Sequence, residues 1–146
     1  MMMFNFMDIS ASALTAEKTR IDIIAKNLAN ANTTRATGGM PYRRQMPVFK
    51  EHTVNSFSRI LNSKINRSNF EGVKISRIVE DQSPFRTIYE PGHPDADENG
   101  YLKTSNVDVV KEMVDMISAQ RAYDSNITAI NTSKAMMTKA LEIGRR

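Results

Sequence analysis

Both ends of this chain are long stretches with no helix-breaking residue. Residues 7–34 and 107–143 contain neither Gly nor Pro, whereas residues 35–105 hold all five Pro and five of the six Gly. Because Pro removes a backbone donor and Gly favours turns, this distribution predicts two terminal helices around a non-helical middle. The 146 residues are enough for one ordinary domain.

Apolar residues in the first stretch recur at the spacing of an amphipathic helix. Asp8 or Ser10 is suited to cap its first turn, and Gly38 lies shortly after its expected end. A helix from Ile9 to Thr34 would be about 39 Å long at ~1.5 Å per residue. The stripe positions are Met7, Leu14, Ile21, Ile24, Leu28 and Ala31.

The second stretch follows a stricter repeat of alternating three and four residues, and its period near 3.5 favours supercoiling against a partner helix. We expect Asn106 to cap this helix and Gly144 to end it. At roughly 55 Å, the helix exceeds what a compact domain needs, which indicates a partner. A second apolar flank is formed by Val110, Val114 and Ile117. The stripe positions are Val109, Met113, Met116, Gln120, Tyr123, Ile127, Ile130, Lys134, Met137 and Leu141.

The middle of the chain changes to short apolar runs with a period of two, which predicts strands. Residues 52–70 are polar and rich in Asn and Ser, and they are interpreted as an extended or partly helical insertion. The expected strands are 42–49, 72–79 and 85–89, with Tyr101–Leu102 following an Asn99–Gly100 turn.

Together these patterns predict an α+β fold. The long N- and C-terminal heptad helices are expected to pair as a coiled-coil layer, with a small, irregular, β-rich segment between them. The expected boundaries are 1–34 for the N-terminal helix, 35–105 for the middle segment and 106–146 for the C-terminal helix. The two helices would form one helical domain.

Composition argues against catalysis. The chain has no Cys, and its two histidines, His52 and His93, lie in the irregular middle with no second His nearby. No nucleophile, base and orienting group occur in a credible arrangement. We therefore expect no enzyme activity and no catalytic, metal-binding or cofactor-binding residue.

One acidic turn gives an alternative function. Asp95 to Gly100 matches the first half of a calcium-binding loop, but the cation Lys103 stands at the ninth position and Asn106 replaces the bidentate Glu that the loop needs at the twelfth. A turn held by side-chain to backbone hydrogen bonds is the simpler interpretation. A calcium-binding module through this turn remains the alternative.

Charge is segregated along the chain, although the net charge is only +4. Residues 36–86 carry nine Lys or Arg against four Asp or Glu, and residues 87–102 carry four acidic residues and no basic one. A weak nucleic-acid-binding function through the basic middle is a further alternative. The lack of a dense basic run and the small number of aromatic residues that could stack on bases argue against nucleic acid as a partner.

The amino end is apolar, but it has no basic region before Asp8 and is too short to cross a membrane. We expect no cleaved secretory signal and no membrane insertion. A protein of this kind would be cytoplasmic unless it leaves the cell by a route that uses no cleaved leader.

Several motifs resemble one known family. Residues 24–32 are similar to the amino-terminal "NLAN" signature of the bacterial flagellar rod and hook axial proteins, and residues 105–114 with 119–123 resemble their carboxy-terminal signature. Residues 39–44 and 89–101 resemble the proximal-rod, FlgC-type branch of that family. The residues that carry the resemblance are Asn27, Leu28, Asn30, Tyr42, Arg43, Asn106, Val107, Asp108, Gln120, Arg121 and Tyr123.

The resemblance implies a structural subunit of the flagellar basal body. Such a subunit would assemble helically with copies of itself and with other rod proteins, would meet basal-body ring and export-gate components, and would transmit torque from motor to hook and filament. It would be exported by the flagellar type III apparatus without a cleaved signal. The expected assembly stripes are Leu14, Ile21, Ile24, Leu28, Met113, Met116, Tyr123, Ile127, Ile130, Met137 and Leu141.

Overall fold

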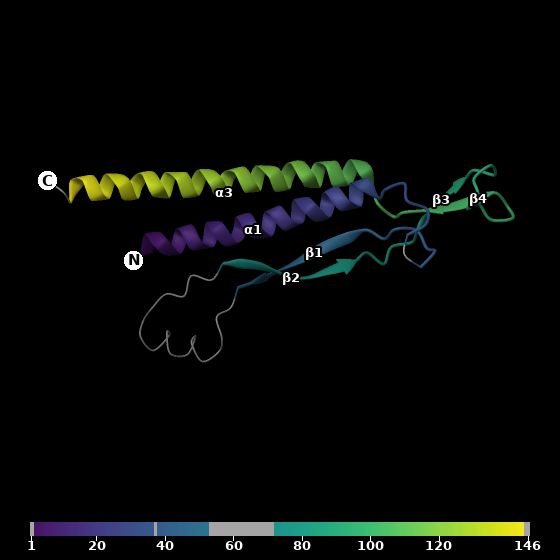
Figure 1. Cartoon of the computed structure of the whole chain (residues 1–146), viewed down its shortest axis with the longest axis horizontal. Coiled ribbons are helices and arrows are strands. Elements are labelled where there is room, and N and C mark those ends of the chain that lie inside the picture. The colour runs from purple at the N-terminus through teal and green to yellow at the C-terminus, as the bar shows by residue number, and fades with distance from the viewer. Residues whose placement is uncertain (1, 37, 53–71, 145–146) are drawn as a thin grey trace, which may run out of the picture. The chain divides into compact units, whose positions relative to one another are not determined.

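The computed structural model describes residues 2–36, 38–52 and 72–144 and has a long helix near each end of the chain (Figure 1). Between the helices, the described residues form four strands in two small sheets, which confirms the α+β class. The elements in chain order are α1 (Met2–Ala29), β1 (Gln45–Glu51), β2 (Val73–Glu80), β3 (Arg86–Tyr89), β4 (Tyr101–Thr104) and α3 (Val109–Ile143). The predicted insertion at 52–70 falls almost wholly outside the described residues.

The chain divides into two compact units, and each unit takes residues from both ends and from the middle. Unit 1 consists of Met1–Thr19, Phe49–Ser76 and Ala119–Arg146, and unit 2 consists of Arg20–Val48 and Arg77–Ser118. The boundaries expected at residues 34 and 105 concern segments of the sequence and stay predictions. Pairing of the two helices as a coiled coil along their length also stays a prediction.

Helix α1 ends five residues before the predicted Thr34. The side-chain amide of Asn30 donates to the carbonyl oxygen of Lys26 (2.8 Å), and the backbone amide of Asn30 donates to the same oxygen (3.2 Å). Because a short polar side chain that bonds nearby backbone groups competes with further helix, the Asn-rich stretch ends α1. The helix also begins earlier than expected, at Met2.

Helix α3 begins at Val109, and its cap differs from the prediction. Asp108 Oδ1 accepts hydrogen bonds from the backbone amides of Val110 (3.0 Å) and Lys111 (3.3 Å), so Asp108 and not Asn106 is the N-cap. The expectation that Asn106 caps the helix was wrong because its side chain has partners elsewhere. At the other end the helix stops at Ile143, before Gly144, as predicted.

Strands β3 and β4 form an antiparallel hairpin in unit 2. Arg86 pairs with Thr104, and Tyr89 pairs with Tyr101. Gly100, in the predicted turn, has φ +78°, a conformation that L side chains rarely adopt, and a Cβ there would meet Pro91 and the Tyr89 ring at 3.0 Å. The four strands overlap the four predicted strands, and their ends differ from the predicted ones by at most three residues.

In unit 1, the chain before β2 passes very close to α1. The Ser12 hydroxyl donates to the carbonyl oxygen of Ile9 (2.7 Å) and accepts from the backbone amide of Val73 (3.0 Å). A Cβ on Gly72 would overlap the Ser12 side chain. Gly72 therefore allows β2 to bond to the helix.

The buried side chains are few and mostly small. Unit 2 contains an apolar cluster of Ala31, Tyr42 and Val107, against which Ala36 and Val109 pack. The other buried apolar residues are Ala16, Ile23, Ile24, Leu102 and Ala119. Among the described residues, no helix has the length and hydropathy needed to cross a membrane.

Candidate functional site

Asn27, near the end of α1, forms hydrogen bonds within unit 2 through both polar atoms of its side-chain amide. Its Oδ1 accepts hydrogen bonds from the Tyr42 hydroxyl (2.9 Å) and the Gln45 backbone amide (2.9 Å). Its Nδ2 donates to the Gln45 carbonyl oxygen (2.8 Å) and to Glu112 Oε2 (3.0 Å). Because a buried amide is costly unless it is bonded, these contacts hold α1, β1 and α3 in one arrangement.

Glu112, in the first turn of α3, is a fully buried carboxylate at 0% exposure. Its Oε1 accepts from Arg44 Nε at 2.6 Å, and the Arg44 side chain is only 13% exposed. Arg44 also lies 3.4 Å from Asp115 and 3.7 Å from Asp81. A buried charge persists only when a cation and hydrogen bonds compensate for lost hydration, and Arg44 supplies both.

Asn106, just before α3, joins two further segments to these residues. Its Oδ1 accepts from the backbone amide of Arg44 (2.8 Å), and its Nδ2 donates to the carbonyl oxygen of Asp81 (3.2 Å) and to Ser83 Oγ (2.9 Å). These bonds take Asn106 away from the capping position. We refer to Asn27, Tyr42, Arg44, Asn106 and Glu112 as the polar cluster.

Two ionisable groups in this region have shifted pKa values. Burial raises the pKa of the Tyr42 hydroxyl, and the carboxylates of Glu112 and Glu80 raise it further, so the hydroxyl stays a neutral donor to Asn27. The Ser83 backbone amide lowers the pKa of Asp81, and the Ser83 side chain and Arg44 also lower it. Both shifts favour the protonation state that the hydrogen bonds need.

Two members of the polar cluster use all their side-chain polar atoms in hydrogen bonds. Asn27 and Glu112 have all their side-chain oxygen and nitrogen atoms bonded to groups of the same chain. Across residues 2–36, 38–52 and 72–144, no three His, Cys, Asp or Glu side chains converge to hold a metal ion. The arrangement can fix three chain segments relative to one another.

Four of the family-signature residues lie in or beside the polar cluster. Asn27, Tyr42 and Asn106 belong to it, and Val107 is 1% exposed in the adjoining apolar cluster. Arg43 lies over the Phe85 ring at 4.3 Å. Asp108 caps α3, Asn30 ends α1, Leu28 and Tyr123 are half-buried, and Gln120 and Arg121 are exposed.

The candidate site residues from the sequence omitted Arg44 and Glu112, which are central to the polar cluster. A Glu two positions beyond an apolar Val109–Val110 pair looks like an ordinary acidic residue in a helix's first turn. Its partner is 68 residues away in the chain. The sequence did offer one signal for these two residues, because Arg44 lies in the motif at residues 39–44 and Glu112 in the motif at residues 105–114.

The predicted stripe residues of α3 differ in exposure. Met116, Tyr123, Ile130 and Met137 are half-buried, whereas Met113 is 49%, Ile127 36% and Leu141 74% exposed. The more buried side of α3 keeps the alternating three and four spacing, with small or polar residues at every second position. Its members are Glu112, Met116, Ala119, Tyr123, Asn126, Ile130, Ser133 and Met137. The assembly role of the predicted stripe stays a prediction.

The predicted stripe residues of α1 are more protected from solvent. Ile24 is 5% exposed, and Leu14, Ile21 and Leu28 are half-buried. Ile23, which is outside the stripe, is equally buried at 5%. The buried side of α1 is therefore wider than the predicted stripe, and the assembly role of that stripe stays a prediction.

In the acidic turn, side chains bond to other groups of the chain. Asp95 accepts from the Thr34 hydroxyl (3.0 Å) and pairs with Arg35 (3.3 Å). Asp97 Oδ1 accepts from the backbone amides of Asn99 (3.1 Å) and Tyr101 (2.8 Å). These bonds are those of a turn stabilised by its own side chains.

Comparisons with known proteins show that this chain is similar to flagellar rod proteins. Residues 7–37 match the family "Flagella basal body rod protein", and residues 98–143 match "Flagellar basal body rod FlgEFG protein C-terminal". The chain is 49% identical to the flagellar basal-body rod protein FlgC of Bacillus subtilis, over 97% of this chain and 98% of the relative. The proteins of that name in Salmonella typhimurium and Borreliella burgdorferi are 41% and 40% identical, with at least 97% of each chain covered.

These relatives are structural proteins, and they give no support to the calcium-binding or nucleic-acid-binding alternatives. The two family matches cover the segments that supply Asn27, Asn106 and Glu112 to the polar cluster. At this identity and coverage, the chain belongs to the family of flagellar basal-body rod proteins of the FlgC type.

Proposed function

We propose that this protein is a structural subunit of the flagellar basal-body rod that assembles helically with copies of itself and with other rod proteins. The near full-length similarity to rod proteins supports the rod as its location. The polar cluster supports a passive, load-bearing role, because its groups fix chain segments and are all used in doing so.

The observation that carries assembly is an apolar face on the first half of α3. Val110 is 71%, Met113 49%, Val114 61% and Ile117 51% exposed. Their spacing of three and four residues places them on one side of the helix, opposite the buried Glu112. A contiguous exposed apolar face of this kind is typical of a protein–protein contact surface.

Torque transmission would depend on the hydrogen bonds and the ion pair that connect the chain segments of unit 2. The Arg44–Glu112 pair and the Asn27 amide connect segments from both ends of the chain, so force on one segment is passed to the others. Packed, hydrogen-bonded interiors deform little under load. A subunit built in this way suits a rigid drive shaft.

Partners and export follow from the same proposal. The subunit would contact other rod proteins and, at the base of the rod, ring and export-gate components. It would reach the basal body through the flagellar type III apparatus with its amino-terminal helix retained. The mature protein purified from basal bodies should therefore carry the residues of α1.

Substituting the apolar face tests the assembly role. In a bacterium whose own rod subunit gene is replaced by this chain, Val114→Asp and Ile117→Asp should abolish rods and motility, because a carboxylate would be placed in a desolvated contact. The matched control is Ser118→Asp, which adds the same charge at a flanking exposed position of α3.

The two outcomes separate clearly. Rods missing in the two apolar variants and present in the control, with all three purified proteins equally helical by circular dichroism, would support the proposal. Motile cells carrying Val114→Asp or Ile117→Asp would show that this face is not an assembly surface.

A further inference from the structure

A groove of about 590 Å³ lies in unit 2 beside the end of α1, and three cationic side chains line it. These are Lys26, Arg35 and Arg43, and Glu80 is the acidic residue of the lining. Lys26 Nζ donates to the neutral Gln45 side chain (3.0 Å). Arg35 is paired with Asp95 (3.3 Å), but within the described parts of the chain neither Lys26 nor Arg43 has a carboxylate at ion-pair distance.

Arg43 is held with its positive charge beside this groove. Its guanidinium lies 4.3 Å from the centroid of the Phe85 ring and donates to the carbonyl oxygens of Asp81 (3.1 Å) and Ser83 (3.4 Å). Stacking on a ring uses the face of a guanidinium and leaves its in-plane N–H donors able to bind a carboxylate. The groove therefore has one fixed cation, Arg43, and one exposed cation, Lys26.

The loop that joins β3 to β4 has the opposite charge. Between residues 87 and 102 the chain carries Glu90, Asp95, Asp97 and Glu98 and no basic residue. Asp95 and Asp97 are bonded within their own chain. Glu90 and Glu98 are exposed, and no described residue forms a side-chain hydrogen bond or ion pair with either of them.

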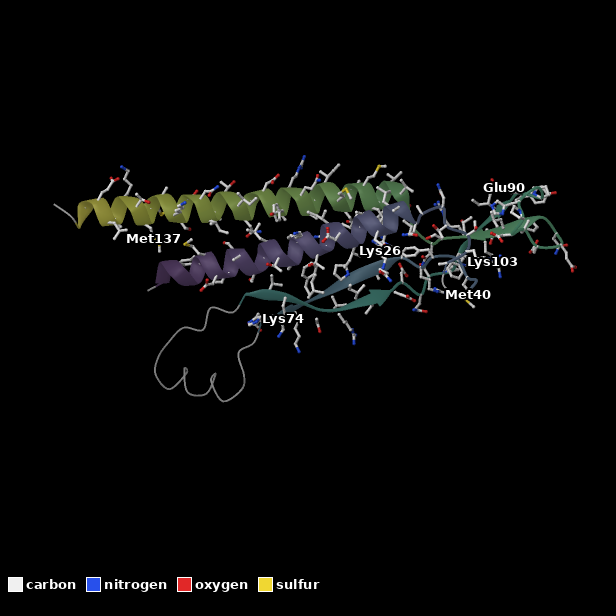
Figure 2. The ribbon with its side chains drawn as sticks, in the orientation of Figure 1. Lys26, Met40, Lys74, Glu90, Lys103 and Met137 are labelled. Atoms are coloured by element: carbon white, nitrogen blue, oxygen red, sulfur yellow. The ribbon has the colours of Figure 1, made fainter. Side chains whose placement is uncertain are left out.

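Asp95 pairs with Arg35 at the edge of the groove of its own chain (3.3 Å), whereas Glu90 and Glu98 form no ion pair with a described cation of the groove. Figure 2 shows Glu90 at the outer end of the hairpin and Lys26 at the end of α1, with the base of the hairpin between them. The Tyr89 and Tyr101 rings make an edge-to-face contact (5.4 Å between centroids) at the root of the loop and are 63% and 49% exposed. The loop thus presents two acidic groups beside an apolar surface to another molecule.

We propose that the acidic loop of one copy of this chain docks in the cationic groove of the next copy. Glu90 and Glu98 would meet Lys26 and Arg43, and the tyrosine pair would face Met40, which lines the groove and is 65% exposed. This inference rests on the proposed function, because it specifies one contact of the assembly. A contact between two different surfaces repeats without closing, which is the geometry that an open helical row of subunits needs.

Disulfide crosslinking tests this contact, since the natural chain contains no Cys. Two copies, one with Glu98→Cys and one with Lys26→Cys, are made together in cells whose own subunit gene has been removed, and mild oxidant is added. We expect a crosslinked dimer that contains one copy of each. The matched control pairs Glu98→Cys with Lys74→Cys, an exposed lysine of β2 that does not line the groove.

Charge reversal gives a second readout. Glu98→Lys alone and Lys26→Glu alone each place like charges together and should lower the number of rods per cell about tenfold. Both changes in the same chain restore opposite charges and should return the count to within about twofold of the parent. Recovery in the double variant is a result that simple misfolding of either single variant does not produce.

The outcomes also distinguish this contact from the proposed function. Motile cells in which the 98–26 dimer does not exceed the 98–74 control, or in which the double variant shows no recovery, would overturn the docking contact and leave the rod function standing. Failure of the unmodified chain to form any rod would overturn the proposed function itself.

Discussion

Polar side chains hold unit 2 together beside its small apolar cluster. Asn27 and Glu112 are among its most buried side chains, at 1% and 0% exposure. Hydrogen bonds contribute only modestly to stability, but leaving a buried partner unbonded is expensive. The polar cluster therefore selects one arrangement of the chain segments and penalises others strongly.

Removing the cation of the polar cluster should destabilise the protein. Arg44→Met leaves the Glu112 carboxylate buried without its charged partner, and breaking such a pair by removing one member costs about 3–5 kcal/mol. Urea denaturation followed by circular dichroism measures the loss. The control Arg35→Met breaks the exposed pair with Asp95 and should cost less than about 1 kcal/mol. Equal effects of the two substitutions would contradict this account of Glu112.

Asp81 should contribute to the loss of stability in acid. Hydrogen bonds from Ser83 lower its pKa in the folded state, so the folded chain binds a proton less readily than the unfolded chain. The stabilisation is present above the unfolded pKa near 3.8 and is lost as the pH falls through the lower, folded pKa.

The substitution Asp81→Asn checks the sign of this effect. The free energy of unfolding of the variant should lie below that of the parent at pH 7, and the gap should narrow at about pH 3. Asp22→Asn, at an exposed position of α1, removes the same charge as a control. A gap that widens toward acid pH would rule out this role of Asp81.

At the scale of the elements, Gly72 allows the start of β2 to lie close against α1. The backbone amide of Val73 donates to the Ser12 hydroxyl, and this bond requires the chain at Gly72 to approach the helix without a side chain. The contact involves a hydroxyl on the helix and one backbone amide, so it depends on geometry more than on hydrophobicity.

The variant Gly72→Ala should disrupt this approach. Its Cβ would overlap Ser12, and relieving the overlap costs roughly 1–3 kcal/mol in strain and lost hydrogen bonding. Gly92→Ala is the matched control, because nothing lies within 4 Å of a Cβ at that position. Thermal unfolding of both variants measures the difference, and an unchanged melting temperature for Gly72→Ala would contradict the close approach.

The two sides of helix α3 differ: one packs against the rest of the chain, and the other is exposed to solvent. Its inner side has small or polar residues such as Ala119, at 0% exposure, which allow close approach of neighbouring backbone. Its first half shows large apolar residues to solvent. This division explains why a stripe chosen only by apolar character contains both half-buried and exposed residues.

For the whole molecule, the isolated monomer should be protected unevenly against hydrogen exchange. Residues 20–48 and 77–118 include the polar cluster, whereas most residues of α3 after Ala119 are exposed. Because a helix that is mostly exposed gains little stability from tertiary contacts, amides between residues 124 and 143 should exchange faster than those of β1 and the start of α3. Exchange measured on the monomer by mass spectrometry at neutral pH decides this.

In the assembled rod, residues 124–143 should become protected, since neighbouring subunits would cover them. Strong protection of these residues already in the monomer would show that the helix has enough partners within its own chain. That result would contradict the expectation that assembly protects this part of α3.

The sequence by itself determined the elements and the family. Helix and strand positions follow from local properties, namely where Gly and Pro lie and whether apolar residues recur every two or every three to four positions. The motifs around Asn27, Tyr42 and Asn106 were visible because each is a short run of the chain. The turn at Gly100 was also predictable, because its signal is the adjacent pair Asn99 and Gly100.

Only the tertiary structure decided which side chains meet. Arg44 and Glu112 are far apart in the sequence, and each alone looks like an ordinary surface charge. Asn106 looks like a helix cap until its partners Arg44, Asp81 and Ser83 are seen. The physical reason is that periodicity records which face of an element is apolar, whereas a buried polar pair depends on two distant segments approaching within hydrogen-bond distance.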